Sequence, residues 1–175
     1  MLNKTFSAFP ILVTERLTLR QPLESDAPDI FLLRSDKVVN QYLNRKPTET
    51  LEEAISFIGK VNVNFEKNES FYWAITETNN DKLIGTICLF DLSDELNKCE
   101  IGYELLPGNQ GQGIMCEALQ AIIQFTFETL ELDTIDAFTH KDNKSSTKLL
   151  LKFGFEETEY VDENHPNLIL FRLSN

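Results

Sequence analysis

The sequence predicts an α/β fold in which helices flank one mixed sheet. Three observations lead to this class. The apolar period changes from helical to strand-like near residue 70, three strand-like segments then follow one another, and helical and strand-like segments alternate after them. The 175 residues are enough for one domain with a sizeable core, and no linker or repeat divides residues 1–175.

The first seventy residues are expected to form one strand and three helices. A strand is expected at residues 12–20, where apolar and β-branched residues are mixed. Ser25 or Asp26 can cap the next helix, and a short helix is expected over residues 38–43. The apolar residues of 48–66 recur at helical spacing, which predicts a longer helix there.

The rest of the chain is expected to hold six strands and two helices. Residues 70–76, 83–90 and 99–106 predict an antiparallel meander, because polar segments separate them. Gly154 suits the end of a helix that begins at residue 143. The other elements expected are a helix over 115–130 and strands near 134–139, 155–160 and 168–173.

The composition restricts the classes of partner. The chain has 28 acidic and 16 basic residues, a net charge of −12, which argues against nucleic-acid binding because that requires a basic face. The charge suits a cationic partner if acidic side chains line a cleft, and otherwise serves only solubility. No stretch approaches the ~18 apolar residues of a membrane span, and no signal peptide opens the chain. Cys88, Cys99 and Cys116 lack metal-ligand spacing, so reduced thiols in a cytoplasmic protein without a metal are expected.

The segment 106–119, LPGNQGQGIMCEAL, places three glycines between an expected strand and an expected helix. Such a loop can bind a phosphate, because glycines let the backbone approach the anion and the first amides of a helix are unpaired. A P-loop requires Lys and Ser or Thr where Ile114 and Met115 stand, and a dinucleotide loop requires Gly where Cys116 stands. From the loop alone, a phosphate site and a plain glycine-rich turn remain equally open.

Four sequence blocks, taken in order, give the loop a context. They are TERLTLR at 14–20 with Asp26 after it, LIG and EIGY at 83–85 and 100–103, QGQGIMCEAL at 110–119, and Asn143-x2-Ser146 followed by Gly154-Phe155. In these residues the chain resembles the GNAT acetyltransferases, specifically the branch typified by the ribosomal-protein alanine N-acetyltransferases. The resemblance spans residues 14–155, and the ordered set is more specific than any block alone.

The resemblance implies a GNAT fold, which is a mixed, mostly antiparallel, seven-stranded sheet with a splay between strands 4 and 5. It implies acetyl-CoA as co-substrate, an amine as acceptor, and a chain able to pair as a homodimer. The pantetheine arm of the cofactor would lie in the splay. At Gly108 the wider family carries Gln or Arg, so this loop is expected to hold the pyrophosphate through its backbone. The residues expected to contact the cofactor are Leu105, Leu106, Gln110, Gly111, Gln112, Gly113, Ile114, Met115 and Asn143.

Direct acetyl transfer requires a base for the ammonium, a donor for the thioester oxyanion and an acid for the departing thiolate. The resemblance favours Glu100 as the base, and strand alternation puts Glu104 on the same face. Both could instead be solvated strand residues, or act through a water. The expected oxyanion donor is the backbone N–H of Leu105 or Leu106. The resemblance favours Ser146 as the acid. The alternative is that Ser146 only caps the start of a helix by bonding to its backbone.

The glycine loop contains no Lys or Arg, although the cofactor carries several negative charges. Lys144, Lys148 and Lys152 fall on one face of the last expected helix. We therefore expect Lys148 and its neighbours to meet the 3′-phosphate side of the cofactor. An ordinary solvated helix face is the alternative.

Together these inferences predict an acetyl-CoA-dependent N-acetyltransferase that moves an acetyl group directly to a primary amine. A protein N-terminal α-amine, as in ribosomal-protein acetylation, is the favoured acceptor, and a polyamine or aminoglycoside is the second class. The alternative outside the enzymes is a non-catalytic acyl-CoA-binding protein, which would need the loop and Asn143 but not Glu100 or Ser146.

Overall fold

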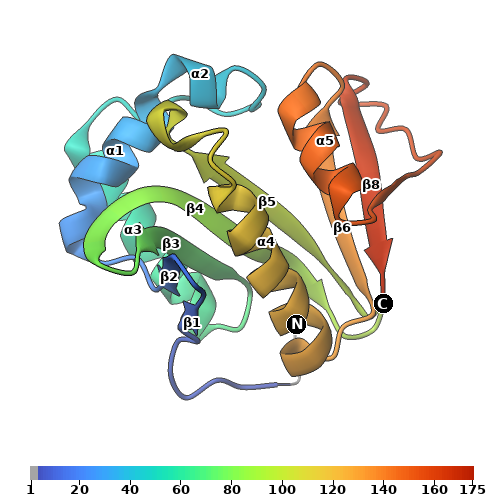
Figure 1. The fold of residues 1–175 in the computed structure, drawn as a ribbon, viewed down its shortest axis with the longest axis horizontal. Coiled ribbons are helices and arrows are strands. Elements are labelled where there is room, and N and C mark those ends of the chain that lie inside the picture. Colours follow the sequence, from blue (N-terminus) through green and yellow to red (C-terminus); the bar gives the residue numbers. More distant parts are fainter. Residues whose placement is uncertain (1–3) are drawn as a thin grey trace.

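One eight-stranded sheet runs through the molecule, in the order β1-β2-β3-β4-β5-β6-β8-β7 (Figure 1). We describe it from a computed structural model, and the description extends over residues 4–175. Every neighbouring pair is antiparallel except β5 and β6, so the sheet is mixed and mostly antiparallel, as expected. The strands are β1 (Leu12–Val13), β2 (Leu17–Arg20), β3 (Phe71–Glu77), β4 (Asn80–Ser93), β5 (Lys98–Leu105), β6 (Thr134–His140), β7 (Glu156–Glu157) and β8 (Leu168–Ser174).

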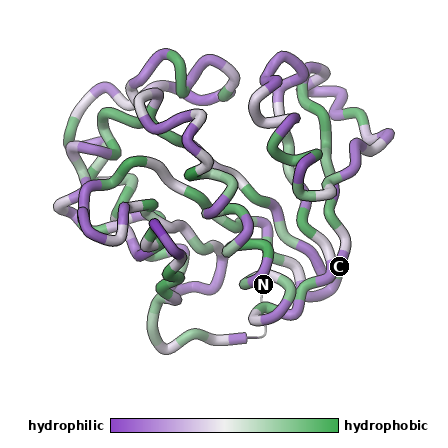
Figure 2. The backbone as a smooth tube through the Cα atoms, in the orientation of Figure 1, coloured by the Kyte–Doolittle hydropathy of each residue, from purple (hydrophilic) through white to green (hydrophobic). Residues whose placement is uncertain are grey.

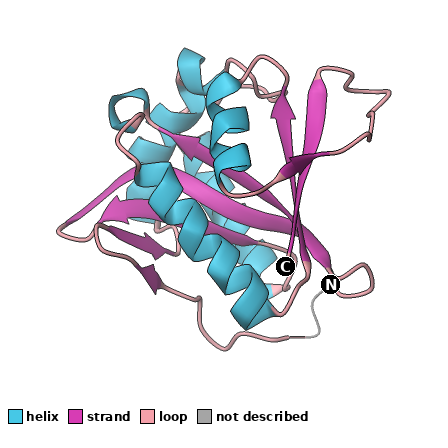
Figure 3. Cartoon of the chain, turned by 45° about the vertical axis from the view of Figure 1, so that its right-hand side comes forward, coloured by secondary structure: helices cyan, strands magenta, loops and turns pink. Residues whose placement is uncertain are grey.

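Helices cover both faces of this sheet (Figures 1 and 3). On one face α1 (Ala27–Ser35) and α3 (Leu51–Glu66) pack together, with the short α2 (Lys37–Asn40) beside them. On the other face lie α4 (Ile114–Gln124) and α5 (Lys144–Lys152). Within residues 4–175, none of these helices has the length and apolar character needed to cross a membrane.

The core between the sheet and α4 is built around Trp73, whose side chain is fully buried. Its indole stacks on Phe71, with ring centroids 5.5 Å apart, and meets the ring of Phe125 edge-on. The indole Nε1 donates a hydrogen bond of 2.8 Å to the Pro10 carbonyl, which satisfies the one polar atom of the side chain. Apolar residues recur along the central strands (Figure 2), and their burial supplies the main driving force for folding.

The parallel strands β5 and β6 pair over three residues only. Residues 98–100 of β5 are in register with 134–136 of β6, and β5 continues to Leu105 without a partner on that side. Over the same length β6 remains paired with β8 up to His140. The two strands therefore diverge toward their carboxyl ends (Figure 1), which is the expected splay between the fourth and fifth predicted strands.

The first and the sixth predicted strands differ from expectation. The strand expected at 12–20 turns back on itself, because the Thr14 hydroxyl accepts the Leu17 N–H at 3.0 Å and the Thr14 N–H donates to the Leu17 carbonyl. This turn divides it into β1 and β2 and makes eight strands of the expected seven. The strand expected at 155–160 pairs over two residues only, because the exposed polar residues that follow leave the sheet edge.

The helix expected over 115–130 changes its winding part of the way along. After α4 the chain continues as a π-helix over Phe125–Leu130. The buried Thr126 hydroxyl donates to the Ile122 carbonyl at 2.8 Å, and a hydroxyl that bonds back to the preceding turn competes with the regular backbone ladder. The π-helix keeps Phe125 and Leu130 in the core.

Gly85 is where two backbones approach most closely. A Cβ on this residue would lie 2.5 Å from the Glu104 carbonyl oxygen and 2.7 Å from a methyl carbon of Leu105. We expect Gly85→Ala to lower the free energy of unfolding by about 1–3 kcal/mol, because β4 and β5 must move apart. Gly59→Ala, in the exposed middle of α3 where a Cβ meets no atom within 4 Å, should raise it by about 0.5–1 kcal/mol. Urea unfolding of both variants measures this, and equal stabilities would contradict the prediction.

Candidate active site

The glycine loop joins the end of β5 to the start of α4. Gly111 and Gly113 have φ angles of 75° and 78°, in the left-handed region that favours glycine. Gly113 is the residue before the first turn of α4, and no side chain caps that turn. The first amides of the helix are therefore free to bind an anion, and the helix dipole favours negative charge there.

Loop side chains hold the loop rather than the anion. The amide nitrogen of Gln110 donates to the Leu105 carbonyl at 2.9 Å, and that of Gln112 donates to the Gly108 carbonyl at 2.9 Å. Ile114 is buried, so only its backbone is available to a ligand, and the partly buried Met115 packs against the core. A Cβ on Gly108 would meet no atom within 4 Å, so its lack of a side chain is not a packing requirement.

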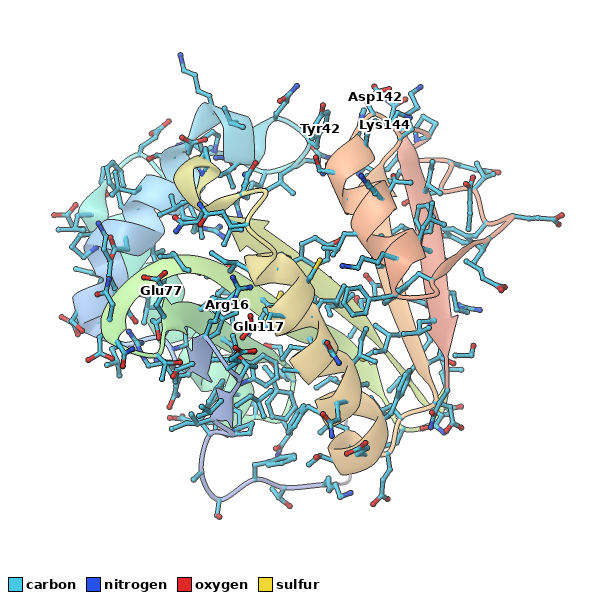
Figure 4. All side chains as sticks on the ribbon, viewed as in Figure 1. Arg16, Tyr42, Glu77, Glu117, Asp142 and Lys144 are labelled. Carbon is cyan, nitrogen blue, oxygen red and sulfur yellow. The ribbon has the colours of Figure 1, made fainter. Side chains whose placement is uncertain are left out.

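Arg16 and Glu117 clamp the loop from the side of β2 (Figure 4). One carboxylate oxygen of Glu117 accepts from the Thr14 hydroxyl at 2.6 Å and the Arg16 backbone N–H at 2.8 Å, and the other accepts from Arg16 Nε at 2.7 Å. Arg16 also donates to the Gln112 carbonyl at 3.1 Å. Burial disfavours ionisation of Glu117, but these bonds outweigh it and lower the pKa of the carboxyl. The sequence did not predict that Arg16 would be a cation beside the loop, although Arg16 belongs to the TERLTLR block at 14–20.

The backbone of β5 presents amides to the splay. The Leu106 N–H donates to the Ile84 carbonyl at 3.0 Å, so it is used within the sheet and is not the free oxyanion donor that was considered. Successive amides of an antiparallel strand point to opposite sides. The N–H groups of Tyr103 and Leu105 therefore point toward β6, in the part of β5 where β6 has parted from it.

Ser146 and Asn143 lie at the start of α5. The side-chain carbonyl of Asn143 caps the helix by accepting the Ser146 N–H at 3.2 Å. The Ser146 hydroxyl lies 2.8 Å from the Tyr103 hydroxyl, so it contacts β5 across the splay rather than only satisfying backbone. Burial raises the pKa of Tyr103 to about 12 despite this bond, so the phenol keeps its proton at neutral pH. Sequence reasoning gave Tyr103 no role.

Glu100 lies where β5 and β6 separate, as the last residue of β5 in register with β6. Burial raises the pKa of Glu100 to about 7, the carboxylates of Asp91 and Asp136 add to the shift, and Lys98 opposes it. A carboxylate with a pKa near the working pH is suited to accept a proton from an amine. Strand alternation turns its side chain to the face opposite Tyr103, so Glu100 and Ser146 lie on opposite sides of β5.

Glu104, on the Glu100 face, is already paired. Both carboxylate oxygens bind the guanidinium of Arg45, one of them at 2.8 Å, and Arg45 Nε donates to Asn40 at 2.8 Å. Both side chains of the pair are largely buried. Both oxygens of Glu104 are thus already engaged by Arg45, which leaves Glu100 as the carboxylate of this face that is free to meet an amine.

An aromatic pair bridges the open end of the splay. Tyr42, in the loop after α2, stacks on His140 at the end of β6, with centroids 5.4 Å apart and planes 27° apart. Figure 4 shows Tyr42 beside Asp142 and Lys144, which precede and begin α5. This contact thus joins the loop after α2 to the end of β6.

A cavity of about 730 Å³ lies beside the loop, between α4 and the end of α5. Gly113, Cys116 and Gln120 line it from the α4 side and Lys152 from α5, with Lys152 Nζ 3.6 Å from Cys116 Sγ. Of the lysines expected near the cofactor, Lys152 is thus the one that lines this cavity. Lys148 is exposed one turn earlier on α5. No group of three or more His, Cys, Asp or Glu side chains in residues 4–175 is placed to hold a metal ion.

Comparison with known proteins identifies the family. Residues 16–156 match the family model described as "Acetyltransferase (GNAT) domain". The chain belongs to the GNAT acetyltransferase family. It is 36% identical over 149 residues to YoaA, an uncharacterized N-acetyltransferase of Bacillus subtilis, covering 85% of this chain and 84% of the relative. It is 28% identical over 107 residues to the [ribosomal protein uS5]-alanine N-acetyltransferase of Escherichia coli, covering 61% and 55%.

A solved structure shares the fold. The ribosomal L7/L12 α-N-protein acetyltransferase RimL, in complex with coenzyme A, superimposes with a TM-score of 0.82 at 21% identity, covering 94% of this chain and 98% of that one. The family and fold predicted from the sequence are confirmed. The chain is an acetyl-CoA-dependent N-acetyltransferase. The uncapped amides that follow Gly113 are chemically suited to an anionic group such as a pyrophosphate.

The raised pKa of Glu100 predicts a pH-dependent effect on stability. Its folded-state pKa of about 7 lies above the ordinary value of 4.5, so the wild type loses stability as pH rises through this interval. Glu100→Gln stays neutral, and we expect it to melt higher than the wild type at pH 8, with the advantage fading toward pH 4. Thermal unfolding at constant ionic strength measures this, with the exposed Glu163→Gln as control. A variant less stable than wild type at pH 8 would refute the expectation.

Proposed function

We propose that the protein transfers an acetyl group directly from acetyl-CoA to a primary amine, and that a protein N-terminal α-amine is the acceptor. The observation that carries the proposal is the placement of Glu100 and the Tyr103–Ser146 pair on opposite faces of β5, beside the splay. A protein that only bound acyl-CoA would need the loop but neither of these groups. The ribosomal acceptors named for relatives support an α-amine.

The chain's own groups hold the donor in three places. Acetyl-CoA supplies the acetyl group as a thioester. The backbone amides of residues 110–115 bind its pyrophosphate, with Gly111 and Gly113 giving the loop its curvature. The strand amides of Leu105 and Tyr103 bind the pantetheine arm and the thioester oxygen, and Asn143 borders the same space from α5.

Proton transfers proceed on the two faces of β5. Glu100, directly or through a water, takes a proton from the ammonium so that the free amine can attack the thioester carbon. An amide of β5 stabilises the oxyanion that forms. Ser146, bonded to the Tyr103 hydroxyl, donates a proton to the thiolate as the carbon–sulfur bond breaks. The attacking nitrogen releases its second proton to water, and Ser146 regains a proton from water through the Tyr103 hydroxyl, so the phenol ends the cycle protonated. No acyl-enzyme forms on this route.

Removal of the base should reduce turnover and spare cofactor binding. We expect Glu100→Gln to lower kcat/KM by about a hundredfold or more, with the affinity for CoA unchanged. Thiol release from acetyl-CoA and a panel of peptide, polyamine and aminoglycoside acceptors measures the rate, and calorimetry with CoA measures the affinity. The α-amine of the substrate itself titrates near pH 8, so its own deprotonation also shapes the dependence of rate on pH. The fall in rate toward low pH must therefore be compared between wild type and Glu100→Gln. Unchanged rates at every pH would exclude Glu100 as the base.

Ser146→Ala should lower kcat by about tenfold or more, because the thiolate then departs without its proton donor. The exposed neighbour Ser145→Ala is the matched control, since it has the same chemistry one residue earlier on α5. Equal turnover of Ser146→Ala and Ser145→Ala would show that Ser146 is not the proton donor and has a structural role only.

Lys152 is proposed to meet the 3′-phosphate of the cofactor in the cavity beside the loop. We expect Lys152→Ala to weaken acetyl-CoA binding by about three- to tenfold and to leave 3′-dephospho-acetyl-CoA binding unchanged. Lys148→Ala should have the same sign and a smaller effect, because Lys148 lies one turn further from the cavity. An equal loss of affinity for acetyl-CoA and 3′-dephospho-acetyl-CoA would mean that Lys152 does not contact the 3′-phosphate.

A further inference from the structure

Arg34 differs from the other four arginines of the chain. The other four each bind a carboxylate, in the pairs Arg16–Glu117, Arg20–Asp26, Arg45–Glu104 and Arg172–Asp136. Within residues 4–175 the Arg34 guanidinium has no hydrogen bond and no ion pair, and its Nε is buried without a partner. The side chain as a whole is half-buried, and a buried N–H donor without an acceptor is costly. The chain nevertheless keeps it unpaired while carrying 28 acidic residues.

Packing holds Arg34 over the sheet face that carries Glu104. Arg34 lies in the last turn of α1, and its guanidinium carbon is 3.8 Å from the centre of the Phe57 ring. Phe57 in turn packs edge-on against Tyr72 of β3, with centroids 5.2 Å apart. The Tyr72 hydroxyl donates to Thr86, which is opposite Glu104 in the register of β4 and β5. This contact with the Phe57 ring holds the guanidinium in place, and a guanidinium fork matches the geometry of a planar carboxylate.

The electrostatics show that Arg34 and Glu104 act on the same space. Burial, together with the charge of Glu104, raises the pKa of the Cys88 thiol to about 12, and the charge of Arg34 opposes this shift. Burial and Glu104 likewise raise the pKa of Tyr72, and Arg34 opposes them. Since Arg45 already binds Glu104 with both nitrogens, the cluster contains two arginine charges and one carboxylate. The Glu104 carboxylate is thus already matched by Arg45, and the charge of Arg34 has no carboxylate paired with it.

This cluster lies on the side from which an acceptor would arrive. The loop and α4 cover the other face, where the proposed function puts the pyrophosphate of the donor. Glu100 and Glu104 share the Arg34 side of β5, and the Leu105 amide beside Glu104 points into the splay. A group bound to Arg34 would therefore sit next to the amine that is to be acetylated.

We propose that Arg34 binds a carboxylate of the acceptor, and that the acceptor is a peptide N-terminus followed closely by an acidic residue. This inference rests on the proposed function and narrows its acceptor class. A guanidinium binds a carboxylate through two parallel hydrogen bonds, which is specific as well as strong. A polyamine has no group to offer Arg34 and would be repelled by it. The net negative charge of the whole chain is thus not a guide to the charge of the acceptor.

Kinetics with paired peptides test the proposal. The probes are C-terminally amidated tetrapeptides with Asp or Asn at position two or three, and dipeptides with a free or amidated carboxyl end. We expect wild type to favour Asp over Asn by about tenfold in KM, as for a charge-assisted hydrogen bond, and Arg34→Gln to abolish the preference with kcat unchanged. Arg34→Lys should keep part of the preference for Asp, because lysine retains the positive charge but lacks the two parallel N–H donors of the guanidinium. A preference confined to the free carboxyl of the dipeptides would identify a small amino-acid acceptor and overturn the peptide assignment.

Lys37→Gln is the matched control, because it removes the same charge from an exposed position in the neighbouring helix α2. It should retain the full preference for Asp. If Lys37→Gln loses the preference for Asp as Arg34→Gln does, the preference comes from the overall electrostatic field of the protein. The proposal then fails. If Arg34→Gln changes the Asp and Asn peptides equally and also lowers the melting temperature, Arg34 has a structural role only.

An equilibrium measurement separates this proposal from the proposed function. Calorimetry with CoA-saturated wild type and the N-acetylated product peptides requires no turnover. Tighter binding of the acetylated Asp peptide than the Asn peptide, lost in Arg34→Gln, supports the Arg34 site even if no catalysis is detected. Turnover of amines with no difference between Asp and Asn, in rate or in binding, keeps the acetyltransferase and rejects the Arg34 site. Absence of binding by either product peptide rejects the site as well.

Discussion

The short parallel pairing of β5 with β6 is the constraint on which the rest of the structure depends. Three residues of register join the two halves of the sheet, and beyond Glu100 the strands part. The amides of Tyr103 and Leu105 are thereby left without a strand partner inside a folded protein. Backbone groups in such a position require a substitute partner, and an extended ligand that lies along β5 provides one.

The splay also assigns the chemistry to two faces. Odd residues of β5 point toward α4 and α5, where Tyr103 meets Ser146, and even residues point the other way, where Glu100 and Glu104 lie. Proton removal from the amine and proton donation to the thiolate are therefore separated by the thickness of one strand. The two groups need not share an environment, so Glu100 can have a pKa of about 7 while the phenol of Tyr103 remains protonated. This separation gives each group the protonation state that its proposed step requires.

The sequence was a good guide to the parts of the fold that depend on local pattern. Helical spacing predicted α3 and α4, the stop at Gly154 predicted the end of α5, and successive strand-like segments with polar links predicted the meander of β3 to β5. The missing parts depend on contacts between residues distant in the chain. Nothing local distinguishes Arg34 from Arg45, since only the fold brings a carboxylate to one and none to the other. For the same reason the pairing of Tyr103 with Ser146, and of Lys152 with the loop cavity, could not be read from spacing.

The contacts of Glu117 with Thr14 and Arg16 bear on how the site forms during synthesis. Thr14 and Arg16, which hold the cofactor loop through Glu117, are synthesised before that loop. Glu117 follows Arg16 by 101 residues. Until then the segment that carries Thr14 and Arg16 has no carboxylate from the loop to bind. The loop is thus ordered by contacts that span more than a hundred residues of chain, which costs more chain entropy than a local turn would. A truncation of the amino-terminal strand would consequently loosen the cofactor site without removing any residue that touches the cofactor.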